Sequence, residues 1–422
     1  MKDQLICGID IGSSKIATLI DLNQPDSEEL KVIGFNSTLS SGVKKGLIVD
    51  IDQVAAALEE SVEKAERMAG HKINHAFVSV GGPHISSLNS HGIVAISNPN
   101  GEIIENDVER VIEAARAISL SSTKEIIEVL PKNYIVDGQE GIKNPIGMTG
   151  VRLEVDTHII TASSTNLKNI NRVFDDLGIK NDGFIFSGLA SSMAVLTPTE
   201  KELGVVLVDI GGGKMDICIF TEGSLSYSSS VPVGARHITN DIAVGLRVSL
   251  DSAEKVKLYL SQTLKDYEKN KRKINQLSLR DLQLPENITE VSLKTLVDEI
   301  IMARLEEIFK LIFEEIEKSG LGNNIPSGIV LTGGGSLTSG MVNVGKKILG
   351  LPIRVGYPSG LTGLIDEVID PSYSTTVGLI LYGKKFKMQE GSRLRKFNQI
   401  FKDFSLDNTF VKIRDFFKQF IP

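Results

Sequence analysis

The feature that most constrains the fold of this chain is a turn that occurs twice, each time at the end of an apolar segment. The first copy reads Gly8-Ile9-Asp10-Ile11-Gly12-Ser13-Ser14-Lys15-Ile16-Ala17, and the second reads Val208-Asp209-Ile210-Gly211-Gly212-Gly213-Lys214-Met215-Asp216-Ile217. A third glycine cluster, Thr332-Gly333-Gly334-Gly335-Ser336, follows a third apolar segment. One copy alone is equally compatible with an ordinary tight hairpin. The repetition favours two related halves that hold one phosphorylated ligand.

The residue types in these turns suit phosphate binding. Glycine and serine let backbone N–H groups approach phosphate oxygens without a Cβ in the way. A lysine after the turn adds a cation, and the aspartate that ends the strand offers an oxygen ligand to Mg²⁺ and its waters. The residues after each turn again read as strand, so we expect hairpins. A P-loop runs from its turn into a helix instead, and neither its pattern nor the G-x-G-x-x-G fingerprint occurs in the sequence.

Composition indicates a globular protein of two or more domains, with 422 residues and 41% apolar content. Cys7 and Cys218 lie beside the two turns, and their apolar surroundings predict buried, reduced thiols, which suits the cytoplasm. The sequence predicts neither a signal peptide nor a transmembrane helix. The six histidines show no metal-site spacing, and we expect His71 and His75 to be surface residues at the end of a helix.

Charge is distributed unevenly along the chain. Residues 384–422 hold ten Lys/Arg and four Asp/Glu, a net charge of +6, so the other 383 residues carry −13 of the total of −7. Half of the sixteen phenylalanines also lie in 384–422. The acidic body argues against general nucleic-acid binding, whereas the basic, phenylalanine-rich tail predicts contact with an anionic surface.

The tail ends in an amphipathic helix. At about 100° per residue, one face of 410–421 is apolar and the other is polar with a basic edge. The apolar face holds Phe410, Ile413, Phe416, Phe417, Phe420 and Ile421, and the basic edge holds Lys412, Arg414 and Lys418. This pattern suits the interface of an anionic bilayer. A terminal helix that docks on the body or on a partner protein remains the alternative.

The order of apolar segments predicts an α/β protein with two similar halves. Helices are expected at Ile51–Ala69, at about Asn106–Ile118 with Asn106 as its cap, and over much of 251–320. The helix at Gly188–Leu196 is rich in small residues and can cross another helix closely. The predicted first domain consists of 1–83 and 162–196, interrupted by an inserted subdomain at 84–161. The second domain is 197–374, with a helical subdomain at about 236–320. The last part of the chain is divided into a return helix at 375–388, a linker or stem at 389–404, and a membrane-targeting helix at 405–422.

Together these features resemble the ATPase superfamily of actin, Hsp70 and the sugar kinases, and within it the FtsA family of bacterial division proteins. Besides the turns, the resemblance rests on Gly141-Ile142-Lys143-Asn144-Pro145-Ile146-Gly147-Met148-Thr149-Gly150-Val151-Arg152, on Phe186-Ser187-Gly188-Leu189-Ala190-Ser191-Ser192 and on Ile238-Thr239-Asn240-Asp241-Ile242. It covers nearly the whole chain. The segment 141–152 is its most specific part, because the superfamily at large lacks it.

The resemblance implies an actin-like fold of two duplicated ribonuclease-H-like domains, with an inserted subdomain and a C-terminal amphipathic helix. It implies ATP with Mg²⁺ between the halves, with Asp10 and Asp209 facing the metal and its waters. The implied nucleotide-binding residues are Gly12, Ser13, Ser14 and Lys15, Gly211, Gly212, Gly213 and Lys214, Glu254 and Lys257 near the ribose and base, and Gly334, Gly335 and Ser336 beside the adenosine. From spacing alone, Glu254 and Lys257 are equally compatible with an i,i+3 surface pair.

The resemblance also implies head-to-tail filaments, a tether for the C-terminal tail of FtsZ, and a peripheral location on the cytoplasmic face of the membrane at the division site. Other division proteins are possible partners. One departure concerns catalysis. Hydrolases of the superfamily generally carry a Glu or Gln that positions the attacking water, and Phe184–Met193 contains neither an acid nor an amide. We therefore expect weak ATP hydrolysis at most, with ATP acting mainly as a conformational ligand.

Two other functions fit parts of the pattern. A small-molecule kinase of the same superfamily would need a carboxylate base aimed at its acceptor. An actin-like adaptor of another membrane machine, such as pilus assembly, usually lacks the amphipathic tail. An Hsp70-type chaperone would need a peptide-binding domain, for which no segment is long enough.

Overall fold

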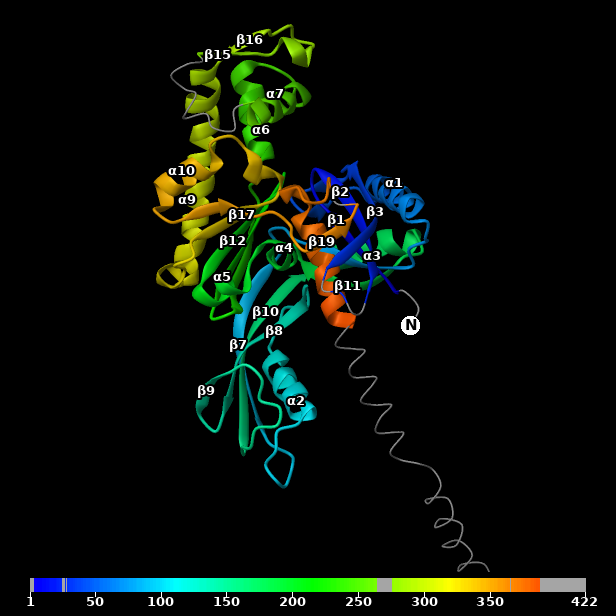
Figure 1. Ribbon diagram of the computed structural model, residues 1–422, viewed down its shortest axis with the longest axis vertical. Coiled ribbons are helices and arrows are strands. Elements are labelled where there is room, and N and C mark those ends of the chain that lie inside the picture. The colour runs from blue at the N-terminus through cyan, green and yellow to red at the C-terminus, as the bar shows by residue number, and fades with distance from the viewer. Residues whose placement is uncertain (1–3, 25–26, 28, 264–274, 365, 388–422) are drawn as a thin grey trace, which may run out of the picture.

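The computed structural model describes residues 4–24, 27, 29–263, 275–364 and 366–387. Two α/β halves lie side by side, with a helical subdomain above one of them and a smaller sheet below (Figure 1). The predicted tail helix at 405–422 and the linker before it lie outside the described residues. Within those residues, no helix is long and apolar enough to span a bilayer.

The first half is built on a six-stranded sheet of order β11-β6-β1-β2-β3-β19. Its strands are β1 (Gln4–Ile11), β2 (Lys15–Asn23), β3 (Leu30–Leu39), β6 (His75–Val80), β11 (Lys180–Phe186) and β19 (Leu361–Gly363). Helix α1 (Ile51–Ala69) covers β2 and β3 and contacts α3 (Ser164–Asp176). On the opposite face the helix at 374–387 lies against Gly8 and Phe77.

The second half repeats this topology. Its sheet has the order β14-β13-β12-β17-β18, made of β12 (Val205–Ile210), β13 (Met215–Thr221), β14 (Ser224–Val231), β17 (Ile329–Thr332) and β18 (Ile353–Val355). In both halves the first three strands pair antiparallel, and the next two are added in parallel beside the first strand. The duplication expected from the repeated turn is therefore present in the strand order itself.

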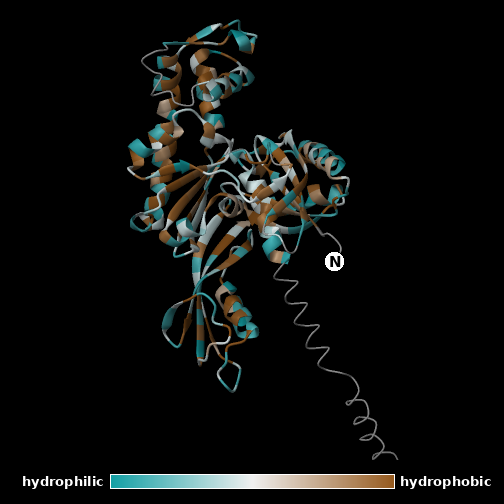
Figure 2. Cartoon of the chain, viewed as in Figure 1, coloured by the Kyte–Doolittle hydropathy of each residue, from teal (hydrophilic) through white to brown (hydrophobic). Residues whose placement is uncertain are grey.

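Helix α4 (Ser187–Val195) lies between the halves and contacts strands of both sheets. Its small residues allow the close crossing that the sequence predicts, because a Cβ at Gly378 of the helix 374–387 would collide with the carbonyl of Ala190. The opposite face of the second sheet packs against α6 (Arg236–Leu246), α9 (Met302–Ser319) and α10 (Met341–Leu349). Figure 2 shows hydrophobic residues concentrated on the strands of both sheets.

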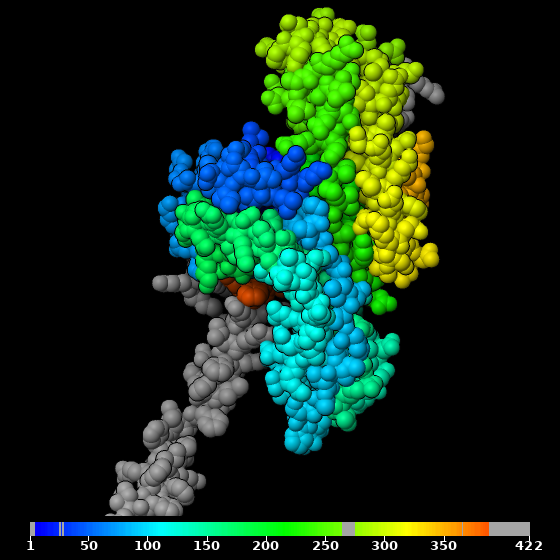
Figure 3. Space-filling model, turned by 180° about the vertical axis from the view of Figure 1, so that it is seen from behind, coloured from blue at the N-terminus to red at the C-terminus, as the bar shows by residue number. Residues whose placement is uncertain are grey.

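Residues 84–161 form most of a separate four-stranded sheet of order β7-β10-β8-β9. Its strands are β7 (Ser86–Ala95), β8 (Lys124–Val136), β9 (Gln139–Ile142) and β10 (Arg152–Ser163), and α2 (Glu105–Arg116) covers one face. The lobe has its own small core, which includes Val111, Tyr134 and Leu153, and Figure 3 shows it projecting from the body. We call it the insert.

Two local expectations need correction. Asn106 does not cap α2: the helix starts at Glu105, and the Asp107 carboxylate accepts the N–H groups of Ile104 and Ser97, each at 3.2 Å. This arrangement satisfies two free donors at the helix start. His71 and His75 are exposed, but His75 begins β6 and pairs with Asp182 at 2.9 Å rather than ending a helix.

The segment 251–320 is mostly helical among the described residues, as expected, but it also contains a hairpin. After α7 (Leu250–Thr263) come the short strands β15 (Gln276–Ser278) and β16 (Glu290–Ser292), which pair antiparallel before the chain becomes helical again at Lys294. Buried Leu277 and Val291 join the core of the second half, so this hairpin covers the helix ends. Both cysteines are free and buried, as predicted.

Candidate phosphate-binding cleft

The two glycine turns meet at the floor of a cleft between the halves, with a volume of about 850 Å³. That is within the usual range for small-molecule sites. The predicted residues that line it are Asp10, Gly12, Ser13, Ser14, Lys15, Asp209, Gly211, Gly212, Gly213, Lys214, Glu254, Lys257, Gly334 and Gly335. Residues from the first, second and third glycine clusters therefore share one cavity, as the repetition suggested.

Both turns have the same backbone geometry. In the first, the N–H of Gly12 donates to the carbonyl of Lys15 at 3.0 Å; in the second, the N–H of Gly211 donates to the carbonyl of Lys214 at 2.9 Å. The turns also touch each other, because a Cβ at Gly212 would collide with the hydroxyl of Ser14. The glycine at 212 is required by this close approach.

Each strand-end aspartate is buried and held by hydroxyl groups. Asp10 accepts from Ser79 at 2.5 Å, and burial raises its pKa. The Asp209 carboxylate accepts from the Thr375 hydroxyl at 2.9 Å and from the Ser191 hydroxyl. It is therefore bonded to both crossing helices, 374–387 and α4. Burial, followed by the neighbouring Asp216 carboxylate, raises the pKa of Asp209 to about 6.

The Asp10 and Asp209 carboxylates fit a Mg²⁺ ion only if a phosphate ligand is bound with it. Among the described residues, no three His, Cys, Asp or Glu side chains converge as a metal site. Mg²⁺ is usually held by one or two carboxylates together with substrate phosphates and waters. Asp10 and Asp209, at matching ends of β1 and β12, can supply that pair.

The lysines of the two glycine turns, Lys15 and Lys214, have different bonding partners. The ammonium of Lys15 donates to the Ser372 hydroxyl at 2.6 Å and lies 3.2 Å from the centre of the Tyr373 ring. Burial lowers the pKa of Lys15 to about 8. Lys214 lines the cleft, but its ammonium already pairs with Asp216 and donates to Ser187 at 3.2 Å.

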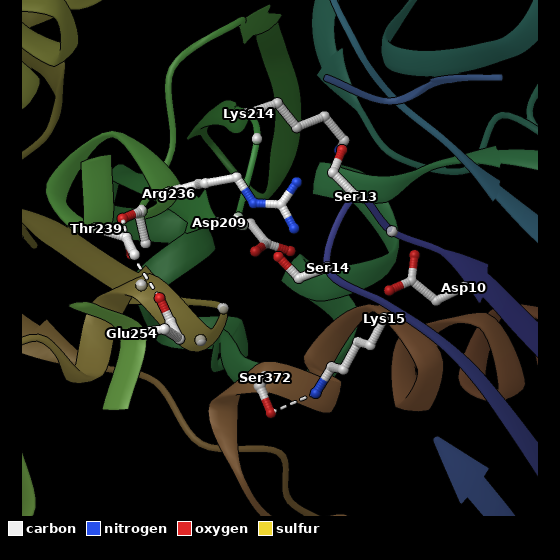
Figure 4. Close-up of a pocket in the computed structure, with 18 of the residues that line it drawn as sticks. Asp10, Ser13, Ser14, Lys15, Asp209, Lys214, Arg236, Thr239, Glu254 and Ser372 are labelled. Atoms are coloured by element: carbon white, nitrogen blue, oxygen red, sulfur yellow. Dashed lines mark hydrogen bonds between the residues drawn. The ribbon is translucent and has the colours of Figure 1, made fainter. Parts of the chain in front are cut away.

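Arg236 is a cation that the sequence analysis missed. It is exposed, it opens α6, and Figure 4 shows its guanidinium extending into the cleft toward Ser14 and Asp209. The only sequence signal was its position directly after Val233-Gly234-Ala235, at a predicted helix start. Other residues of the lining that were not predicted are Ser187, Asp216, Thr239, Ser372 and Thr375.

The wall on the side of the second half carries a small polar network. The Glu254 carboxylate accepts from Lys257 at 2.7 Å and from the Thr239 hydroxyl, and Lys257 also contacts that hydroxyl at 2.9 Å. Glu254 and Lys257 are thus an i,i+3 pair that also faces the cleft. Ser336 is the exception among the predicted residues: it is buried outside the lining and donates to the Gly333 carbonyl at 2.7 Å.

The segment Phe184–Met193 forms the end of β11 and most of α4, and Ser187 is its contribution to the lining. The nearest missed carboxylate is Asp216, which is 1% exposed and lies opposite Asp209 in the strand register. Each Asp216 oxygen already accepts one hydrogen bond, one from Lys214 and the other from Ser230.

Comparisons with known proteins agree with this architecture. Residues 82–161 match the family model described as an SHS2 domain inserted in FtsA, and residues 206–378 match the model for cell division protein FtsA. Cell division protein FtsA of Pseudomonas aeruginosa is 40% identical over 90% of this chain and 89% of its own length. The proteins of that name from Borreliella burgdorferi and Escherichia coli K12 are 39% and 34% identical, with 94% and 93% of each chain covered.

Solved structures show the same fold at low sequence identity. The PilM-PilN type IV pilus biogenesis complex aligns with a TM-score of 0.60 at 14% identity, covering 90% of this chain and 98% of that one. ADP-bound MreB5 of Spiroplasma citri aligns with a TM-score of 0.55 at 13% identity, covering 92% and 98%. These neighbours establish an actin-like ATPase fold.

Proposed function

This chain belongs to the FtsA family of cell-division proteins, and on that premise we propose that it binds ATP with Mg²⁺, polymerises at the cytoplasmic membrane and tethers FtsZ filaments there. The observation that carries the nucleotide part is the pair of matching turns across one cleft. Backbone amides of both turns, two strand-end carboxylates and the cations of Lys15 and Arg236 converge on that cleft. This is the set of groups that a polyphosphate with a divalent cation requires.

In this proposal different residues of the cleft bind the phosphates, the metal, and the ribose and base. The glycines and serines of both turns hold the phosphate oxygens, while Asp10 and Asp209 hold the metal and its waters. Bound Mg²⁺ would offset phosphate charge. Glu254 and Lys257 contact the ribose and base. Hydrolysis is slow because 184–193 offers no acid or amide side chain to position the attacking water, so ATP acts on conformation and assembly.

The membrane and filament parts rest on the sequence and on the family. The apolar face of 410–421, edged by Lys412, Arg414 and Lys418, supplies reversible attachment to an anionic leaflet. Full burial of one such apolar side chain contributes roughly 1.5–3 kcal/mol, and less at an interface. Head-to-tail contacts use two different surfaces of each copy and therefore propagate into filaments. The domain boundaries expected from the sequence, including the return helix at 375–388, belong to the same proposal.

A truncation separates attachment from nucleotide binding. Deleting 405–422 should release the protein from anionic liposomes in a sedimentation assay, while the affinity for a fluorescent ATP analogue stays unchanged. A truncated protein that still sediments with liposomes would refute the membrane anchor.

Electron micrographs of the full chain on an anionic lipid monolayer, with and without ATP, then test whether filaments form and whether they need nucleotide. Adding FtsZ filaments to the same monolayer tests the tether.

A further inference from the structure

The contact between the insert and the second half is a row of polar bonds along β14. The Ser224 hydroxyl donates to the Lys132 carbonyl at 3.0 Å, and the Ser226 carbonyl accepts from Asn89 at 3.4 Å. Further along, the Ser228 carbonyl accepts from the Ser87 hydroxyl at 2.6 Å. The far end of the insert has its own core, but its Ile85 and Ile160 share the larger core with Leu225 of β14. The polar bonds therefore add to this apolar contact in holding the insert against the strand.

A buried histidine lies in the middle of this row. His158 of β10 is 1% exposed, and burial lowers its pKa to about 4, so the ring is neutral. Nδ1 lies 2.8 Å from the Asn89 side-chain oxygen, and Nε2 lies 2.8 Å from the Ser228 hydroxyl. With one donor and one acceptor nitrogen, the neutral ring joins the insert to β14 without adding charge.

The row ends at the phosphate cleft. The Ser230 hydroxyl accepts at 3.0 Å from the backbone N–H of Gly82, which belongs to the short root, Gly81–Pro83, that leads into the insert. The same hydroxyl donates to the Asp216 carboxylate at 2.6 Å. The other oxygen of Asp216 holds the ammonium of Lys214, which belongs to the second glycine turn. A continuous set of bonds therefore connects Lys214 of the second glycine turn, through Asp216 and Ser230, to Gly82 at the root of the insert.

Lys214 also lies directly against Gly81, at the root of the insert. A Cβ at Gly81 would collide with the Lys214 ammonium, so glycine at this position leaves room for the cation. Figure 4 shows the Lys214 side chain crossing the cleft wall toward Ser13 of the first turn. The cation thus lies between the two phosphate turns and the root of the insert.

We infer that phosphate occupancy of the cleft controls how tightly the root of the insert is held against β14, through Lys214, Asp216 and the positioning residue Ser230. An anion in the cleft competes with Asp216 for the Lys214 ammonium. As the ammonium moves toward the phosphate, Ser230 becomes the main remaining partner of the Asp216 carboxylate. A hydroxyl that donates to a less neutralised carboxylate is a stronger acceptor, so its bond from Gly82 strengthens.

This inference rests on the proposed nucleotide function and extends it to the insert. The test is hydrogen–deuterium exchange on the full chain, with and without a non-hydrolysable ATP analogue and Mg²⁺, while a fluorescence titration measures affinity separately. We expect the analogue to slow exchange in peptides from 80–92 of the wild-type protein. Ser230→Ala should abolish that slowing and change affinity by less than about threefold, because Ser230 does not line the cleft.

Ser224→Ala is the matched control. It removes a hydroxyl bond of the same kind, from the same strand to the insert, but one that has no contact with Asp216. It should keep the nucleotide-dependent slowing, and Ser230→Thr, which retains the hydroxyl, should restore it. Similar melting temperatures for the two alanine variants separate the loss of coupling from unfolding.

Two results would overturn the inference: a wild-type protein that binds the analogue without any change in 80–92, or a Ser230→Ala protein that changes as the wild type does. If the titration detects no binding to the wild type, the proposed nucleotide function fails first, and the coupling fails with it.

Discussion

At the scale of single residues, burial decides which cation of the cleft responds to pH. Lys15 lies under the Tyr373 ring and against Ser372, and the resulting loss of hydration lowers its pKa to about 8. The carboxylates of Asp10, Asp370 and Asp209 partly oppose that effect. Lys214 differs, because its buried partner Asp216 raises its pKa despite full burial. Of these two lysines, Lys15 is therefore the one that loses its charge near pH 8.

If Lys15 holds phosphate, affinity for ATP should fall as the pH rises. The ammonium is mostly protonated below pH 8 and loses its proton above it, so the affinity of the wild-type protein should weaken by up to about fivefold between pH 8 and pH 9. In Lys15→Arg the guanidinium stays charged, so the profile should be flat over the same range. Titrations with a fluorescent ATP analogue measure both profiles. Parallel profiles for the two proteins would show that Lys15 is not the titrating group.

At the scale of elements, the crossing of α4 with the helix 374–387 joins the two halves. Ala190 and Gly378 are in backbone contact there, and Ser191 and Thr375 from the two helices both donate to Asp209. Small residues let the helices approach closely, and the hydroxyl groups then reach a carboxylate of the cleft. The geometry of the crossing therefore sets the position of a predicted metal-binding group.

Gly378→Ala should destabilise the protein because the new methyl group meets a backbone carbonyl that cannot move without shifting α4. Overpacking of this kind typically costs about 1–3 kcal/mol, which urea denaturation can measure. Gly245→Ala in α6 is the control. There the methyl group meets only the flexible end of Ile300, and alanine is the better helix former by about 1 kcal/mol. Equal stabilities of the two variants would contradict the tight crossing.

At the scale of the whole molecule, charge is divided between body and tail. Residues 384–422 carry +6 and the other 383 residues carry −13. If the tail attaches the protein to an anionic bilayer as we propose, the same surface repels the acidic body, and the opposed charges would orient the molecule. Because the attraction is partly electrostatic, salt should weaken it.

Liposome binding should consequently fall when NaCl is raised from about 0.1 M to about 0.5 M, as the Debye length shortens to a few ångströms. The variant Lys412→Glu, Arg414→Glu, Lys418→Glu should lose most of its binding, since each basic residue near the surface contributes about 1 kcal/mol. The variant Lys310→Glu, Lys346→Glu, Lys347→Glu makes the same change in net charge at exposed positions on the body. Sedimentation should show it bound as wild type; equal loss in both variants would assign the effect to net charge rather than to the tail.

Local sequence patterns determined a large part of this protein. The repeated strand-turn-strand pattern gave the duplication, because turn chemistry and apolar period are local properties. The helix Ile51–Ala69 followed from its amphipathic pattern. The structure adds the caps: Asp50 accepts from the N–H of Gln53 at 3.1 Å, and Gly70 ends the helix in a left-handed conformation. The small residues of 188–196 predicted a close helix crossing for the same reason.

Tertiary structure alone decided which distant groups meet. Arg236 enters the cleft because α6 starts beside the second turn, Asp216 pairs with Lys214, and Ser336 turns away from the ligand side despite its place in a glycine cluster. The hairpin at 276–292 interrupts a mostly helical segment, and its apolar residues complete a core that no local pattern reveals. The repeated turn was thus enough to place a phosphate clamp in the sequence. Its connection through Ser230 to the insert exists only because folding brings strands from different segments into register.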